Sequence, residues 1–237
     1  MEIAKLGPLV VLTGAGVSAE SGVPTFRGAE GLWRTYRAEE LATPIAFHRD
    51  PQLVWEFYAW RRELLAACKP NRAHLLLAEI ENQISDFTLI TQNVDGLHAA
   101  AGSRNIIELH GTIWRMRCTS CEDRWDDWSV PLGELPPPCP GCGEKARPDV
   151  VWFGETLDPE VLDLAFEVAQ CAHTMLVIGT SGIVYPAAEL PRVCKTRGAR
   201  LIEINPQETP ISGIADQVYR SKAAIGLQDW WADLQNN

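Results

Sequence analysis

The sequence predicts an α/β fold in which helices cover both faces of a Rossmann-like, doubly wound parallel sheet. Two observations support this prediction. Short apolar runs alternate with longer helical stretches along most of the 237 residues, a pattern typical of parallel sheets. Small or polar residues follow the apolar runs, as they do where strand ends carry a binding site. A segment rich in cysteine and proline interrupts the alternation, and we interpret it as an inserted module.

Strands are expected where a short apolar run ends at a small or polar residue. These runs lie at residues 9–12, 87–90, 106–109, 175–178, 201–204 and 218–220. Helices are expected at residues 51–68, 73–83, 159–171, 186–197 and 227–234. Proline begins three of these helices, at a position where the missing amide hydrogen has no intrahelical partner to lose.

The inserted module divides the predicted Rossmann-like domain into two parts along the chain. Residues 1–114 and 148–237 are assigned to that domain, and residues 115–147 to the module. A helical segment within residues 35–80 is expected to contribute a pocket to the binding site at the strand ends.

Composition limits the possible partners. The net charge of -10 and the pI near 5.0 argue against broad contact with nucleic acid, which needs a basic surface. They suit either simple solubility or substrates that carry lysine. The first apolar run is too short for a secretory signal or a membrane span. Because 7 cysteines is an odd number and no secretory signal is visible, we expect a reducing, cytoplasmic location without membrane contact.

Paired cysteines in the module predict a metal site. Cys118-x-x-Cys121 and Cys139-x-x-Cys142 have the spacing of a zinc ribbon, in which thiolates complete a closed tetrahedral shell. A closed shell makes the zinc structural. The alternatives are two disulfides or unrelated thiols, which the spacing and the expected compartment disfavour. A zinc ribbon also suits nucleic-acid binding, but acidic residues beside Cys121 argue against that.

A glycine motif follows the first predicted strand. Gly14-x-Gly16-x-x-Ala19 is a loose dinucleotide fingerprint, whose backbone amides can face a diphosphate at a strand-to-helix turn. The alternative is a turn that merely needs small residues. The acidic residue expected about 20 positions later for the ribose is offered only loosely by Glu39 or Glu40. An ordinary nicotinamide dehydrogenase therefore fits poorly.

Polar residues also follow the second and third predicted strands. Gln92, Asn93 and Asp95 come after one, and His110 after the other. An imidazole at this edge can take a proton near neutral pH. Alone, His110 would be explained as well by a structural role, but the other strand-end motifs point to the same edge.

Taken together, these motifs resemble those of the sirtuin family. The motifs that carry the resemblance are residues 14–27, residues 92–95, His110-Gly111-Thr112, the four module cysteines, Gly179-Thr180-Ser181 and Asn205. It implies an enzyme that consumes NAD to remove acyl groups from lysine side chains of proteins. The implied products are free lysine, nicotinamide and 2′-O-acyl-ADP-ribose.

The resemblance also implies residue roles. His110 would act as general base on a ribose hydroxyl, and Asn93 would contact the reacting ribose. Asp95 would hold the nicotinamide carboxamide, and Phe26 would keep water from the ribose. The other implied NAD-binding residues are Gly14, Ala15, Gly16, Ser18, Ala19, Arg27, Trp33, Gln92, Gly179, Thr180, Ser181, Asn205 and Ala223.

Tyr58 and Arg61 predict the class of acyl group. They lie three residues apart on a predicted helix and so share one face. A hydroxyl and a guanidinium there can bind a carboxylate at the end of an acyl chain. Spacing alone favours a solvated arginine, but the pair resembles class III sirtuins, which accept succinyl, malonyl or glutaryl lysine. Thr25 agrees, and removal of acetyl groups is also expected.

The acyl-lysine substrate is expected to lie along residues 151–154. Val151, Trp152, Phe153 and Gly154 resemble the family segment that pairs with the substrate backbone as a strand. Without the resemblance, an ordinary strand-to-loop run explains them. Three rival functions remain: a mono-ADP-ribosyltransferase that uses NAD, a non-catalytic sensor of NAD or ADP-ribose and, as the weakest, a zinc-ribbon protein that binds nucleic acid. A monomer is compatible with the sequence, which does not determine the oligomeric state.

Overall fold

The computed structural model describes residues 6–24, 32–33 and 36–236. Its main sheet has six parallel strands in the order β11-β10-β9-β1-β4-β5. The strands are β1 (Leu9–Thr13), β4 (Phe87–Thr91), β5 (Ile106–Glu108), β9 (Thr174–Ile178), β10 (Arg200–Ile204) and β11 (Gln217–Tyr219). The predicted doubly wound parallel sheet is confirmed. The strand order reverses beside β1, which marks that end of the sheet as the expected ligand site.

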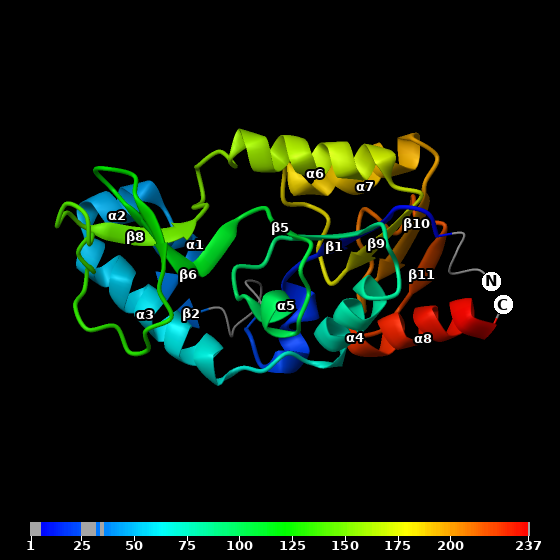
Figure 1. Cartoon of the computed structure of the whole chain (residues 1–237), viewed down its shortest axis with the longest axis horizontal. Coiled ribbons are helices and arrows are strands. Elements are labelled where there is room, and N and C mark those ends of the chain that lie inside the picture. The colour runs from blue at the N-terminus through cyan, green and yellow to red at the C-terminus, as the bar shows by residue number, and fades with distance from the viewer. Residues whose placement is uncertain (1–5, 25–31, 34–35, 237) are drawn as a thin grey trace.

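Helices cover both faces of this sheet (Figure 1). On one face lie α4 (Arg72–Glu81) and α8 (Ala223–Asn236), and on the other lie α6 (Pro159–Cys171) and α7 (Leu190–Thr196). Successive residues of β1 serve the two layers: Leu9 and Val11 belong to the α4/α8 core, whereas Val10 and Leu12 belong to the α6/α7 core. Burial on both faces explains why this strand is a continuous apolar run.

Three predicted helices differ in the structure. The helix predicted at residues 186–197 begins as a 3-10 turn (Ala187–Glu189), and α7 itself starts only at Leu190. Helix α8 begins at Ala223, four residues before the predicted start at 227. The turn after β1 is not an α-helix but two 3-10 turns, η2 (Ala15–Val17) and η3 (Ala19–Ser21). The amide of Gly16 donates a hydrogen bond to the carbonyl of Gly179 at 2.8 Å, across the sheet edge. That bond fixes the loop against the neighbouring strand, so no regular helix starts here.

A smaller lobe packs beside the main sheet (left in Figure 1). Its antiparallel sheet has the order β7-β6-β8, formed by β6 (Gly111–Cys118), β7 (Arg124–Asp126) and β8 (Ala146–Val150). The predicted module limits, 115–147, fall inside β6 and β8, two strands that the sequence analysis did not anticipate. The other elements here are β2 (Leu32–Trp33), β3 (Tyr36–Arg37), α1 (Ala38–Leu41), α2 (Pro44–Arg49) and α3 (Pro51–Ala67). Helix α5 (Leu97–Ala100) lies beside α4 instead.

Helix α3 carries the smaller lobe's part of the site, and its ends are encoded locally. The Asp50 side chain accepts from the amide of Leu53 at 3.0 Å, while Pro51 occupies the first turn, so both N-terminal preferences are met. Its inner face packs in a second core with β6 and β8. The indole of Trp55 donates to the carbonyl of Ala146 at 2.8 Å, which holds α3 against β8.

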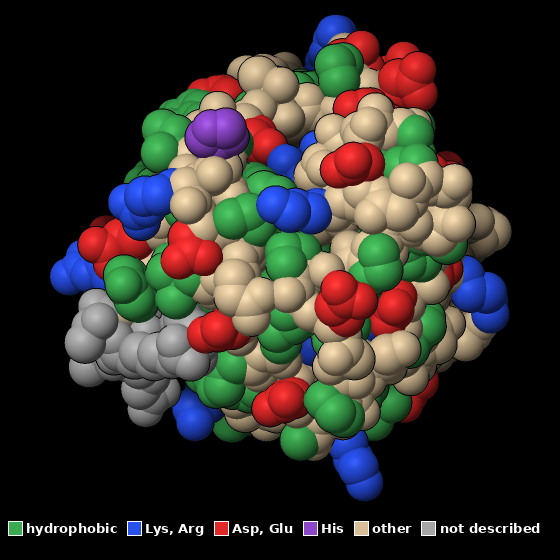
Figure 2. Space-filling model, turned by 90° about the vertical axis from the view of Figure 1, so that its left-hand side faces the viewer, with side chains coloured by type: hydrophobic (Ala, Val, Ile, Leu, Met, Phe, Trp, Pro, Cys, Tyr) green, Lys and Arg blue, Asp and Glu red, His purple; other side chains and the backbone are tan. Residues whose placement is uncertain are grey.

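The surface of this lobe is mixed in charge. In the described part of the face in Figure 2, acidic and basic side chains are interspersed among apolar ones, without a continuous basic patch. Among the residues that the structure describes, no helix combines the length and apolar character needed to cross a bilayer.

Candidate active site

A cavity of about 860 Å³ lies between the carboxyl ends of the main strands and the smaller lobe. The structure brings many of the predicted residues to its wall. From the main sheet these are Gly14, Ala15, Gly16, Ala19, Gln92, Asn93, His110, Gly179, Thr180, Ser181, Asn205 and Ala223. From the smaller lobe and the segment that follows it they are Tyr58, Arg61, Val151, Trp152, Phe153 and Gly154.

Three of the predicted residues fall on a part of the chain that the structure does not describe. Phe26 and Arg27, like Thr25, lie outside the described residues, and Trp33 belongs to β2. Sequence reasoning missed residues 183–185 and 206–210, which do line the cavity. A signal was present, because these loops follow β9 and β10, and ligands collect at the carboxyl ends of parallel strands.

The glycine loop and the end of β9 approach each other very closely. A Cβ atom on Gly16 would lie 2.7 Å from the carbonyl oxygen of Gly179. Gly179 has a φ of +62°, and a Cβ there would lie 2.5 Å from the amide nitrogen of Val17. Both positions therefore require glycine. The result is a cradle in which backbone, rather than side chains, forms the cavity wall.

Behind the wall, Ser18 links Asn93 to Asp95. The hydroxyl of Ser18 donates to Asp95 Oδ2 at 2.7 Å and accepts from Asn93 Nδ2 at 3.1 Å. Asn93 Nδ2 also donates to the carbonyl of Gly14 at 3.2 Å. Both amide hydrogens of Asn93 are thus used inside the protein, and Oδ1 remains as the acceptor it offers. Among the described residues, Ser18 and Asp95 support this wall without lining the cavity.

His74 belongs to the same network, although sequence reasoning assigned it no role. Its Nδ1 accepts from the amide of Asn71 at 3.2 Å, so the proton on Nε2 faces the hydroxyl of Ser18 at 3.3 Å. Burial lowers the pKa of His74 to about 4, and the ring is neutral at pH 7. The one local signal was its position three residues after the N-cap Asn71.

His110 has the tautomer of a base. A carbonyl can only accept, so His110 Nδ1 donates to the carbonyl of Gln92, at 2.9 Å. The lone pair is then on Nε2. Burial lowers the pKa of His110, opposed by the bond to Gln92. The ring is therefore neutral at pH 7 and able to take a proton within the cavity.

Tyr58 marks the other end of the cavity. Its hydroxyl oxygen accepts from the indole nitrogen of Trp152 at 2.9 Å. Since Trp152 can only donate, the hydroxyl proton of Tyr58 stays available for another acceptor. Burial raises the pKa of Tyr58 to about 12, against the effect of the nearby Arg61 charge. Tyr58 is therefore a neutral donor throughout the physiological pH range.

An ion pair orients Trp152. Arg147 donates from both terminal nitrogens to Glu155, at 2.6 Å and 2.9 Å, and its guanidinium lies 3.4 Å from the centroid of the Trp152 ring. Glu155 also accepts from the amide of Trp152 at 2.8 Å. Arg147 and Glu155 thus hold Trp152 from two directions.

Arg61 shares the α3 face of Tyr58 and lines the same cavity. Its guanidinium lies 5.6 Å from the Phe57 ring centroid. Burial lowers the pKa of Arg61, while Tyr58 and Asp95 act in the opposite direction. An arginine remains charged under such shifts, so this end of the cavity holds a partly desolvated positive charge.

Residues 151–154 form no strand within the described structure, and a turn begins at Phe153. The amide of Val151 donates a hydrogen bond to the carbonyl of His110, and the amide of Phe153 donates to the carbonyl of Ala42, each at 2.9 Å. The amide of Trp152 donates to the carboxylate of Glu155. These bonds prevent a regular strand, because three successive amides point to partners in different parts of the protein.

The cysteines of the smaller lobe form a cluster. The sulfurs of Cys118, Cys121, Cys139 and Cys142 all lie within 4.8 Å of one another. Distances of 3.5 Å for Cys118–Cys142 and 3.7 Å for Cys121–Cys139 suit a tetrahedral ion, whose sulfurs lie about 3.8 Å apart for bonds of about 2.3 Å. Donation from the amides of Cys121 and Ser120 lowers the pKa of Cys118 to about 6, which favours a thiolate ligand.

Residues 14–186 match the model of the Sir2 family. The chain belongs to the Sir2 family. It is 55% identical to the NAD-dependent protein deacylase of Aquifex aeolicus over 93% of this chain and 92% of that protein. It is 54% identical to the NAD-dependent protein deacylase of Pyrococcus furiosus over 93% of this chain and 90% of that protein.

Solved structures agree with this family assignment. The fold resembles a Sir2 homologue in complex with NAD, with a TM-score of 0.93 and 51% identity over 99% of this chain and 91% of that chain. It also resembles a mutant Sir2 homologue in complex with 2′-O-acetyl ADP ribose, with a TM-score of 0.93 over 99% of this chain and 94% of that one.

Proposed function

We propose that this Sir2-family chain is an NAD-dependent protein deacylase that favours acyl groups ending in a carboxylate, such as succinyl and malonyl. Acetyl-lysine is a second substrate. The observation that carries the acyl preference is the position of Tyr58 and Arg61 on one wall of the cavity that also contains Asn93 and His110. The other end of the cavity fits NAD, because Gly16 and Gly179 form a backbone cradle there that Cβ atoms would fill.

NAD supplies a ribose carbon that accepts the acyl oxygen as nicotinamide departs. Asn93 offers Oδ1 as an acceptor to the ribose, because its amide hydrogens are used by Gly14 and Ser18. His110 takes a proton from a ribose hydroxyl at Nε2, because Nδ1 is bonded to Gln92. Tyr58 and Arg61 bind the acyl end of the lysine substrate.

The acyl end is chemically selective. A carboxylate there accepts a hydrogen bond from the Tyr58 hydroxyl, whose proton is available because Trp152 donates to the oxygen. The same carboxylate is attracted by the positive charge of Arg61. Charge-assisted hydrogen bonds of this kind are about twice as strong as neutral ones. An acetyl group has no terminal carboxylate to accept from Tyr58 and Arg61, so it gains less binding energy there.

The test is mass spectrometry of a succinyl-lysine peptide and its acetyl twin, each incubated with the protein, with and without NAD. Arg61→Met should lower kcat/KM for the succinyl peptide roughly 10-fold or more and leave the acetyl peptide unchanged. Arg49→Met, the same substitution at an exposed position, is the matched control.

Different results would contradict different parts of the proposal. Loss of acetyl but not of succinyl groups would keep the deacylase and reject the assignment of the acyl pocket. A gain in mass by ADP-ribose on a protein, with no loss of acyl group, would favour the mono-ADP-ribosyltransferase instead.

The cysteine cluster holds one structural zinc ion in this proposal. The distances between its sulfurs support tetrahedral coordination, and four thiolates leave no open position for substrate. Elemental analysis should find one zinc per chain, and Cys121→Ser should lower both the zinc content and the melting temperature. Cys171→Ser, at an exposed cysteine outside the cluster, should change neither. Equal zinc content in the two variants would reject the site.

A further inference from the structure

A buried carboxylate lies beneath the loop that follows β10. Glu203 stands between Ile202 and Ile204 in that strand, and only 1% of its surface is exposed. A buried ionised carboxylate is costly unless donors surround it. Glu203 is not part of the cavity wall, so the chemistry of the proposed reaction does not explain why it is there.

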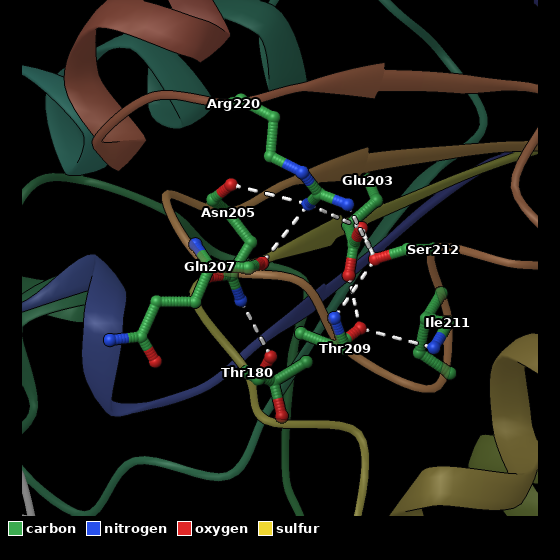
Figure 3. Close-up of polar contacts among 8 residues, drawn as sticks. All are labelled: Thr180, Glu203, Asn205, Gln207, Thr209, Ile211, Ser212 and Arg220. Carbon is green, nitrogen blue, oxygen red and sulfur yellow. Dashed lines mark hydrogen bonds and ion pairs between the residues drawn. The ribbon is translucent and has the colours of Figure 1, made fainter.

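Donors from the following segment satisfy Glu203 (Figure 3). Ser212 Oγ donates to Glu203 Oε2 at 2.5 Å, and Arg220 Nη1 donates to the same oxygen at 3.0 Å. The hydroxyl of Thr209 donates to Glu203 Oε1. The carboxylate thus joins the second half of the loop 205–212, at Thr209 and Ser212, to strand β10.

Arg220 holds the backbone of the same loop. Nη1 also donates to the carbonyl of Gln207 at 3.0 Å and, more weakly, to that of Asn205 at 3.4 Å. Nη2 donates to Ser212 Oγ at 2.7 Å. Because one planar guanidinium reaches three parts of the loop, it fixes their relative positions.

The other side of the loop faces the cavity. Residues 205–210 all line it, whereas Glu203, Ser212 and Arg220 do not. Asn205 Nδ2 donates to the carbonyl of Thr180, at 2.8 Å, so the loop is also joined to the end of β9. The network therefore acts on the cavity through the loop and not by contact with its contents.

We infer that Glu203 and Arg220 are positioning residues that pre-form the adenosine end of the NAD site. A loop already held in the binding conformation loses less conformational entropy when the ligand arrives. This inference rests on the proposed use of NAD. It places Glu203 and Arg220 outside the chemical step and outside the acyl pocket.

A purely structural role makes a different prediction. If the network only stabilised the fold, its loss would weaken NAD and acyl-peptide binding together, or neither. A positioning role weakens only ligands that carry the adenosine group. ADP-ribose is the suitable probe, because it has this group and lacks nicotinamide.

The experiment measures ADP-ribose affinity by calorimetry, together with steady-state kinetics. Glu203→Gln should raise the Kd for ADP-ribose and the KM for NAD roughly 10-fold, the typical effect of a hydrogen bond to a charged group. The KM for the acyl peptide and kcat at saturating NAD should not change. Arg220→Met should have the same effect and Arg220→Lys a smaller one. Asp216→Asn, in the separate pair with Lys195, is the control.

The outcomes separate this inference from the proposed function. If Glu203→Gln does not fold, the same measurements on Arg220→Met test the inference. That variant should fold, because 40% of the Arg220 side chain is exposed. Unchanged ADP-ribose affinity in a folded variant, or an equal rise in both KM values, overturns the inference alone. If the wild-type protein binds neither ADP-ribose nor NAD, the proposed function fails and this inference fails with it.

Discussion

The two ends of the cavity are built differently. At the end with Asn205, loops after parallel strands form the wall, and the Glu203–Arg220 pair holds their backbone. At the end with Tyr58, side chains form the wall, and the Arg147–Glu155 pair holds Trp152 in place. The carboxylate is the deeply buried partner in the first pair and the guanidinium in the second.

This difference separates shape from chemistry. Backbone carbonyls held by Arg220 set the form of a loop, whereas the indole held by Arg147 sets the direction in which Tyr58 donates. Substitutions at the first end should therefore change NAD affinity, and those at the second end should change the choice of acyl group.

The largest effect is expected where the two ends meet. His110→Gln should lower kcat by about 10²- to 10⁴-fold, the usual contribution of a general base. The loss should be the same for succinyl and acetyl peptides, because the proposed mechanism has His110 act on the ribose in both reactions. Steady-state assays with both peptides measure it, and ADP-ribose affinity should stay within about twofold. A loss confined to one peptide would place His110 in the acyl pocket.

The pH dependence of the wild-type enzyme is a second test of His110. Burial holds its pKa below the ordinary 6.5, and only the neutral ring can accept a proton. The rate should therefore be level between about pH 7 and 8 and fall as the pH drops below about 6.5. A decline that begins above pH 7 would require a different base.

Tyr58→Phe should have an intermediate effect, at the acyl end alone. The change removes the donor to the acyl carboxylate and the acceptor of Trp152. We expect kcat/KM for the succinyl peptide to fall roughly 10- to 100-fold, with the acetyl peptide and the KM for NAD nearly unchanged. A matched change on the opposite face, Glu63→Gln at an exposed site, should affect neither substrate. Equal losses for both peptides would mean that Tyr58 supports the fold rather than selects the acyl group.

Arg147→Met should affect stability as well as selectivity. Glu155 is partly exposed, so the expected cost is about 3 kcal/mol, the lower end of the range for breaking a buried pair. Burial would raise the pKa of Glu155, but bonds from Arg147 and the Trp152 amide lower it below its ordinary value. In the wild type this stabilisation is complete above the unfolded pKa near 4.5 and is lost as the pH falls through the lower folded value.

Denaturant titrations of wild type and Arg147→Met across pH 3 to about 6 test this prediction. The difference in free energy of unfolding between the two proteins should shrink as the pH falls. A constant difference would show that Arg147 stabilises by stacking on Trp152 and not through the charge of Glu155.

The smallest effect is expected for Lys195→Met. The Lys195–Asp216 pair is on the surface, with 34% and 41% of the two side chains exposed. Such pairs contribute about 0 to 1 kcal/mol, so stability should change little. Neither KM should change, although Asp216 is close to β10 in space. A rise in the KM for NAD would show that any charge near β10, not only the Glu203 network, affects the loop.

Much of the main sheet and of the site at its strand ends could be predicted from local sequence patterns. The six strands of the main sheet were located because strands buried on both faces are continuous apolar runs, and the polar residues at their ends follow directly. The prediction was wrong for the turn after β1, where the bond from Gly16 to Gly179 replaces a helix. The expected pairing of residues 151–154 with the substrate backbone stays a prediction, although these residues do line the cavity.

Sequence alone determined the sheet, the cysteine spacing and the Tyr58–Arg61 pair, because each depends on residues close together in the chain. Only the tertiary structure decided what holds these residues in place. Trp152 donates to Tyr58 across 94 positions, and Asp95 meets Ser18 across 77. Glu203 looks like one polar residue in an apolar strand until the fold brings Arg220 and Ser212 to it. Hydrogen bonds between distant segments leave no periodic trace in the sequence, since they depend on how the strands and loops pack.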